Sequence, residues 1–179
     1  MLSLVSLLFA ILAAVLYILE GSYWLLLAAI MVLVSGFFDA LDGKVARISS
    51  KASKRGDFVD HVIDRYSDVI ILGAIAVSFR CEISFGLFAL IGVLLASYMG
   101  TQAQALGLGR EYRGILGRAD RIAVLVIISI IQYALEVGDS SLATDIFDYS
   151  LISWMMIYFG LAGNITALQR ARAIWMSLP

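Results

Sequence analysis

The chain has 179 residues, of which 61% are hydrophobic and only 15% are charged. A soluble domain of this length is rarely so apolar, and the apolar residues here lie in long runs, so the composition indicates a membrane protein. The formal net charge of −1 says little, because the charges are sorted by loop, and nothing in the sequence indicates nucleic-acid binding. The single cysteine, Cys81, cannot form an internal disulfide.

Four stretches carry no charged residue, and each is close to or above the length of about 20 residues that crosses a bilayer as a helix. They are residues 1–19, 22–38, 83–109 and 149–169. Two further segments are charged at their starts and apolar afterwards. The first uncharged stretch lacks the basic start and the cleavage site of a signal peptide.

We therefore predict an all-α integral membrane protein, a six-transmembrane-helix bundle that forms one domain over residues 1–179. In chain order, five helices are expected at about 2–19, 22–48, 56–79, 83–106 and 119–137, and a sixth is expected to end at Gln169–Arg172.

Basic residues mark one side of this bundle. Of the thirteen Lys and Arg residues, twelve lie in or beside residues 39–65, the loop 106–121 and the C-terminal tail, and only Arg80 lies elsewhere. The positive-inside rule then places both termini and these loops in the cytoplasm of a multi-pass protein of the cell membrane.

Two pairs of aspartates flank the connection between the second and third predicted helices. Asp39 and Asp42 are three residues apart, and Asp60 and Asp64 are four apart, so each pair shares one helix face. Four carboxylates beside a bilayer indicate a functional site, here a polar cavity open to the cytoplasm. An all-oxygen ligand set favours Mg²⁺ or Mn²⁺, and four carboxylates can hold two such ions.

Other polar residues of the third helix receive a smaller role. Asp57 and Asp68 extend the acidic face and are expected to support the four aspartates. His61 points about 100° away from Asp60 on the helix and is not predicted to be a ligand.

Small residues accompany the aspartates. Gly43 and Ala46 lie near Asp39 on its helix, and Gly56 begins the next helix. Small residues serve close helix packing in membranes, or they leave room for a bulky ligand to approach the backbone. Their position among four aspartates favours the ligand.

The pattern Asp-x₂-Asp-Gly-x₂-Ala-Arg-x₈-Gly-x₃-Asp-x₃-Asp resembles the signature of the CDP-alcohol phosphatidyltransferase family. Eight fixed positions match at the required spacings, and they are Asp39, Asp42, Gly43, Ala46, Arg47, Gly56, Asp60 and Asp64. The resemblance covers the second and third helices closely, and the six-helix layout extends it over most of the chain. Family members usually begin with a juxtamembrane amphipathic helix, which we do not expect within these 179 residues.

The resemblance implies roles for these residues. Asp39, Asp42, Asp60 and Asp64 would hold the metal ions, and Asp64 would also act as general base on the acceptor hydroxyl. The CDP-binding residues implied are Asp42, Gly43, Ala46, Arg47 and Gly56. A homodimer among membrane lipids is implied as well.

The acceptor alcohol is indicated by a second resemblance. Gly117-Arg118-Ala-Asp120-Arg121 and Thr166-x₂-Gln169-Arg170 resemble the family members that use inositol phosphate, and the segment from Gly100 to Arg110 resembles the archaeal ones. Arginines bind phosphate bidentately, and those expected to hold the acceptor phosphate are Arg113, Arg118, Arg121 and Arg170. Against this, the late fourth helix has Gly100, Gln102 and Gln104 where such members carry basic residues.

The function predicted is transfer of a lipid phosphate group from CDP-archaeol or CDP-diacylglycerol to inositol phosphate, with release of CMP. Glycerol 3-phosphate, serine or another polyol are alternative acceptors within the same chemistry. A divalent-cation transporter is an alternative of another class, but a transporter would not require the three small residues at these spacings.

Overall fold

The computed structural model describes residues 2–48, 54–109, 111, 113–138 and 148–178, with only the backbone described for residues 43–48 and 54. These residues form six α-helices, in agreement with the predicted number. The helices are α1 (Leu2–Ile18), α2 (Ser22–Ile48), α3 (Lys54–Val77), α4 (Ile83–Ala105), α5 (Arg118–Val137) and α6 (Leu151–Ser177). The predicted bounds hold within a few residues except at the end of α6, which continues past Arg172.

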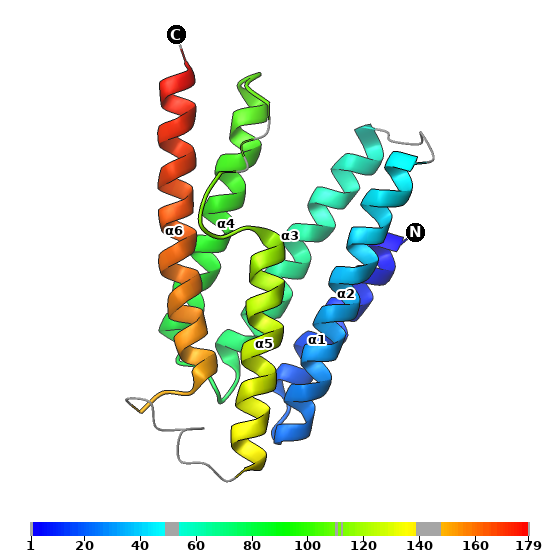
Figure 1. The fold of residues 1–179 in the computed structure, drawn as a ribbon, viewed down its shortest axis with the longest axis vertical. Helices are drawn as coiled ribbons and strands as arrows, with labels where there is room; N and C mark the ends of the chain where they lie inside the picture. The colour runs from blue at the N-terminus through cyan, green and yellow to red at the C-terminus, as the bar shows by residue number, and fades with distance from the viewer. Residues whose placement is uncertain (1, 49–53, 110, 112, 139–147, 179) are drawn as a thin grey trace.

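The helices form an elongated bundle in which α1, α2 and α3 lie together on one side and α4 and α6 on the other (Figure 1). The ends of α2, α4 and α6 and the start of α3 lie at one end of the molecule, the upper end in Figure 1. We call this the motif end, because it carries the four aspartates. Helix α5 begins below that end, between the two groups of helices.

Glycines allow α4 and α6 to pack closely. A Cβ atom added to Gly163 would lie 2.6 Å from the carbonyl carbon of Gly92, and one added to Gly160 would lie 2.1 Å from the Phe88 ring. Such contact between backbones requires residues without a side chain, as is common between helices in membranes. The close crossing fixes α6 against α4 and thereby sets the position of the polar residues at its motif end.

A buried polar network ties the opposite end of the bundle together. Arg80, after α3, donates to Glu136 of α5 through Nε (2.7 Å) and Nη2 (2.8 Å). The backbone carbonyl of Arg80 accepts hydrogen bonds from the hydroxyls of Ser150 and Ser153 at the start of α6. The network therefore holds the ends of three helices far from the aspartates.

Within the described residues, three helices are long and apolar enough to cross a membrane: the Ser22–Asp42 part of α2, α4 and α6. Helix α1 is apolar but has 17 residues, and α3 and α5 carry charges in their first turns. The chain is accordingly a multi-pass membrane protein.

Candidate functional site

Asp60 and Asp64 lie on one face of α3, as their spacing predicts. Together with His61 they offer ligand atoms that all lie within 4.8 Å of one another, and Asp64 is only 5% exposed. The side chain of His61 also lies 3.6 Å from Asp57. His61 is thus closer to the carboxylates than its angular position on an ideal helix suggested.

Asp39 of α2 joins this cluster through Arg118, the first residue of α5. Nη1 of Arg118 donates to Oδ2 of Asp39 at 2.7 Å and also to Oδ1 of Asp64. Because one nitrogen atom bonds both carboxylates, α2 and α3 bring Asp39 and Asp64 together. The other oxygen of Asp39, Oδ1, is buried and has no hydrogen-bond partner in the described part of the chain.

The remaining aspartate, Asp42, contacts the start of α1. Its Oδ2 accepts a hydrogen bond of 3.0 Å from the backbone N–H of Ser3 and a second one from the Ser3 hydroxyl. Neither contact was predicted, since 39 residues separate the two positions.

A second layer of ion pairs lies one turn further along α3. Oδ2 of Asp68 is 2.8 Å from Nη1 of Arg65 and 2.8 Å from Nη2 of Arg121. Arg65 also lies 3.8 Å from Asp64. Asp68 thus supports the cluster as predicted from the acidic face, and it does so by holding two arginines between α3 and α5.

The four arginines predicted to hold the acceptor phosphate do not share one contact site. Arg118 lies among the aspartates and Arg121 pairs with Asp68. Arg170 instead donates to backbone carbonyls, those of Arg113 (2.7 Å) and Ala96 (2.6 Å). The Arg113 side chain is 81% exposed.

Residues of α6 hold the loop that leads into Arg118. The buried Thr166 hydroxyl accepts hydrogen bonds from the backbone N–H groups of Ile115 and Leu116, both at 3.1 Å. Gly114, with φ of +136°, lies so close that an added Cβ would be 2.3 Å from Thr166. With Arg170 one turn further on, Thr166 therefore fixes the loop and the start of α5.

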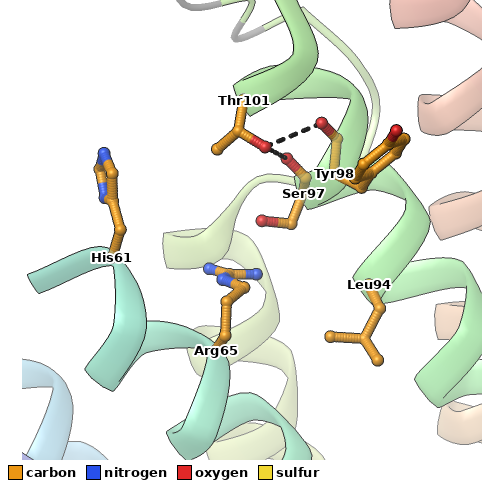
Figure 2. Close-up of a pocket in the computed structure, with 6 residues that line it drawn as sticks. All are labelled: His61, Arg65, Leu94, Ser97, Tyr98 and Thr101. Atoms are coloured by element: carbon orange, nitrogen blue, oxygen red, sulfur yellow. Dashed lines mark hydrogen bonds between the residues drawn. The ribbon is translucent and has the colours of Figure 1, made fainter. Parts of the chain in front are cut away.

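A pocket of about 310 Å³ lies beside this cluster, between α3 and α4. Figure 2 shows the Arg65 guanidinium pointing across it from α3 toward α4. The lining residues are His61, Arg65, Leu94, Ser97, Tyr98 and Thr101. The pocket combines one permanent cation, an imidazole and the hydroxyls of Ser97 and Thr101, and it adjoins Asp64 through Arg65. None of these six residues was predicted to bind a ligand. The position of Arg65 directly after Asp64 in the sequence could have indicated a role for it.

Of the predicted CDP-binding residues, Asp42 is described above and Gly56 lies in the first turn of α3. Gly43, Ala46 and Arg47 belong to α2, but their side chains lie outside the described residues.

The donor set fits a hard divalent cation. Asp60 and Asp64 supply carboxylate oxygens within 4.8 Å of each other, and Arg118 joins Asp39 to Asp64. The buried Oδ1 of Asp39 has no hydrogen-bond partner among the described residues, and a cation would supply one. Oxygen ligands of this kind suit Mg²⁺ and Mn²⁺ rather than softer metals.

Comparison with known proteins agrees with this chemistry. The profile of the CDP-alcohol phosphatidyltransferase family matches residues 1–166. An archaetidylinositol phosphate synthase of Pyrococcus horikoshii is 36% identical over 132 residues, which make up 73% of this chain and 65%, just under two thirds, of that protein. Another, from Methanothermobacter thermautotrophicus, is 33% identical over 159 residues, covering 86% of this chain and 72% of that protein.

Solved structures share the fold. The phosphatidylinositol phosphate synthase of Mycobacterium tuberculosis, in complex with manganese and citrate, superposes with a TM-score of 0.72 at 22% identity, covering 97% of this chain and 82% of that one. The same enzyme with CDP-DAG bound gives a TM-score of 0.71 at 21% identity, covering 97% and 86%.

Fold and site together define a helical membrane protein with a cluster of carboxylates at one end of the bundle. The chain belongs to the CDP-alcohol phosphatidyltransferase family.

Proposed function

We propose that this protein transfers the lipid phosphate group of a CDP-linked lipid to a hydroxyl of inositol phosphate and releases CMP. The observation that carries the proposal is the convergence of Asp39 and Asp64 on Arg118, with Asp60 beside them, in a chain of this family. The relatives named as inositol phosphate-using synthases support the acceptor.

The reaction is a substitution at the lipid-side phosphorus of the diphosphate. The acceptor hydroxyl oxygen forms a bond to that phosphorus, the bond from the same phosphorus to the bridging oxygen breaks, and CMP leaves with the bridging oxygen. The acceptor proton passes to Asp64, whose carboxylate is buried at the junction of α3 and α5. A positioned carboxylate of this kind typically contributes about 10²–10⁴-fold to the rate.

The four motif aspartates would hold the divalent ions, two by analogy with paired-metal phosphoryl-transfer sites. When bound, such ions neutralise the diphosphate and stabilise the charge that develops on the departing CMP. The protein's own part is to hold the carboxylates in place from α2 and α3.

We infer that the acceptor occupies the pocket between α3 and α4. Arg65 and His61 offer nitrogen donors for a phosphate, and the hydroxyls of Ser97 and Thr101 suit a polyol. A volume of about 310 Å³ is at the lower end of the usual range for ligand sites, which suits a small molecule. The contact of Arg65 with Asp64 keeps an acceptor in this pocket next to the proposed base.

Arginines outside the pocket contribute to acceptor binding in this proposal. Arg118 adjoins the aspartates and offers the nearest further cation to an acceptor phosphate, while Arg170 acts by fixing the loop that carries Arg113.

The positive-inside pattern supports an active site and both termini on the cytoplasmic face, with all six helices crossing the membrane. The family resemblance supports a homodimer.

The proposal is tested by incubating the purified protein in detergent with CDP-archaeol or CDP-diacylglycerol, Mg²⁺ or Mn²⁺, and one acceptor at a time. CMP release is expected with inositol phosphate and is expected to stop when excess EDTA is added. Release with glycerol 3-phosphate or serine instead would change the acceptor and keep the chemistry, whereas full release in EDTA would contradict the metal role.

A further inference from the structure

The first turn of α1 contacts one of the four motif aspartates directly. Both the backbone N–H and the hydroxyl of Ser3 donate to Oδ2 of Asp42. Ser3 is 7% exposed, so this contact lies inside the protein rather than on its surface. Nothing in the family signature or in the charge pattern of the sequence pointed to this residue.

Both hydrogen bonds end on Oδ2 of Asp42, and neither uses Oδ1. The backbone N–H of Ser3 is one of the donors at the start of a helix that have no partner within the helix. The positive end of the helix dipole also favours a carboxylate at this place. The start of α1 thus fixes both the position and the rotation of the Asp42 carboxylate.

A second contact between α1 and α2 sets the alignment of the two helices. The Ser6 and Ser35 hydroxyls lie 3.2 Å apart, and the Ser35 hydroxyl donates to the backbone carbonyl of Ser6 at 2.8 Å. Ser6 is fully buried. This pair holds α1 against α2 one turn away from Ser3, and its two hydrogen bonds involve none of the four aspartates.

We propose that Ser3 is a positioning residue for Asp42, holding one carboxylate oxygen so that the other faces the divalent ion. The inference rests on the proposed metal role of Asp42. Hydrogen-bond partners of metal ligands orient those ligands, and their loss typically weakens metal binding about 10- to 100-fold.

The test measures the dissociation constant of Mn²⁺ by electron paramagnetic resonance on the full-length protein in detergent, without substrates. Ser3→Ala should weaken Mn²⁺ binding about 10- to 100-fold, while the backbone N–H of residue 3 is retained. Ser3→Thr and Ser3→Val introduce side chains of nearly the same shape that differ in the hydroxyl. The Ser3→Thr variant should therefore have a Mn²⁺ dissociation constant close to that of the natural protein, and the Ser3→Val variant should have a higher one. Ser6→Ala is the control for α1 packing and should leave the constant unchanged.

Equal Mn²⁺ affinity in Ser3→Thr and Ser3→Val would overturn the inference, even if Ser3→Ala fails to fold. It would also be overturned if Ser6→Ala weakened Mn²⁺ as much as Ser3→Ala, because the effect would then belong to helix packing. If the natural protein bound no Mn²⁺, the proposed metal site itself would fail, which distinguishes the two ideas.

Discussion

Replacing Thr166 with valine keeps the shape of the side chain and removes only its hydroxyl. The hydroxyl accepts the backbone N–H groups of Ile115 and Leu116, and Thr166 and Leu116 are almost fully buried. A buried donor left without an acceptor costs about 1–3 kcal/mol. For a protein of this size, 1 kcal/mol corresponds to roughly 2–4 °C in melting temperature, so Thr166→Val should melt roughly 2–12 °C below the natural protein.

The assay is thermal unfolding in detergent, followed by intrinsic fluorescence, with Thr166→Ser as the control that retains the hydroxyl. Because the loop leads directly to Arg118, the acceptor KM should also rise in Thr166→Val while the KM for the CDP-lipid changes little. A melting temperature equal to that of the natural protein would refute the argument that Thr166 fixes the loop. So would an equal loss of stability in Thr166→Ser.

Three further outcomes are expected. Asp64→Asn should lower kcat about 10²–10⁴-fold while binding of the CDP-lipid, measured by calorimetry, persists; near-normal turnover would assign the base to another group. Ser97→Ala should raise the acceptor KM about 2- to 10-fold, the equivalent of one hydrogen bond. Ser78→Ala, a buried serine after the end of α3 and far from the pocket, should leave the acceptor KM unchanged. Equal KM values in the two variants would contradict binding of the acceptor in the pocket. Glu136→Ala removes the ion-pair partner of the buried Arg80 and should lower the free energy of unfolding by about 3–5 kcal/mol. The kcat of the folded protein should not change. Unchanged thermal stability would contradict a stabilising role of this ion pair.

The helices could be predicted because a bilayer imposes a length on each apolar stretch. Four uncharged runs, bounded by charges such as Glu20 and Arg110, and two segments charged only at their starts predict the six helices and most of their ends. The predicted end of α6 is too early, because Arg170 and Arg172 indicate the end of the apolar span and the helix continues beyond them. In the structure Arg170 turns to the carbonyls of Ala96 and Arg113, and the helix continues to Ser177.

The aspartate site could be predicted only in part. Spacing places Asp60 and Asp64 on one helix face, since helical geometry is local. The contacts of Arg118 with Asp39 and of Ser3 with Asp42 depend on where helices cross, which is set by packing such as that of Gly92 against Gly163. No short sequence pattern encodes these distances, so the partners of the aspartates and the pocket on α4 emerged only from the structure.

In the proposed reaction the lipid phosphate moves onto inositol phosphate, and the acceptor keeps its own phosphate. The most direct test uses inositol phosphate labelled with ³²P, an unlabelled CDP-lipid and Mn²⁺, followed by separation of lipid from water-soluble products. All converted label should be found in the organic phase, in a lipid with two phosphorus atoms, and one unlabelled CMP should appear for each. Label that stays in the aqueous phase while CMP is released, or equal turnover with free inositol, would contradict this reaction.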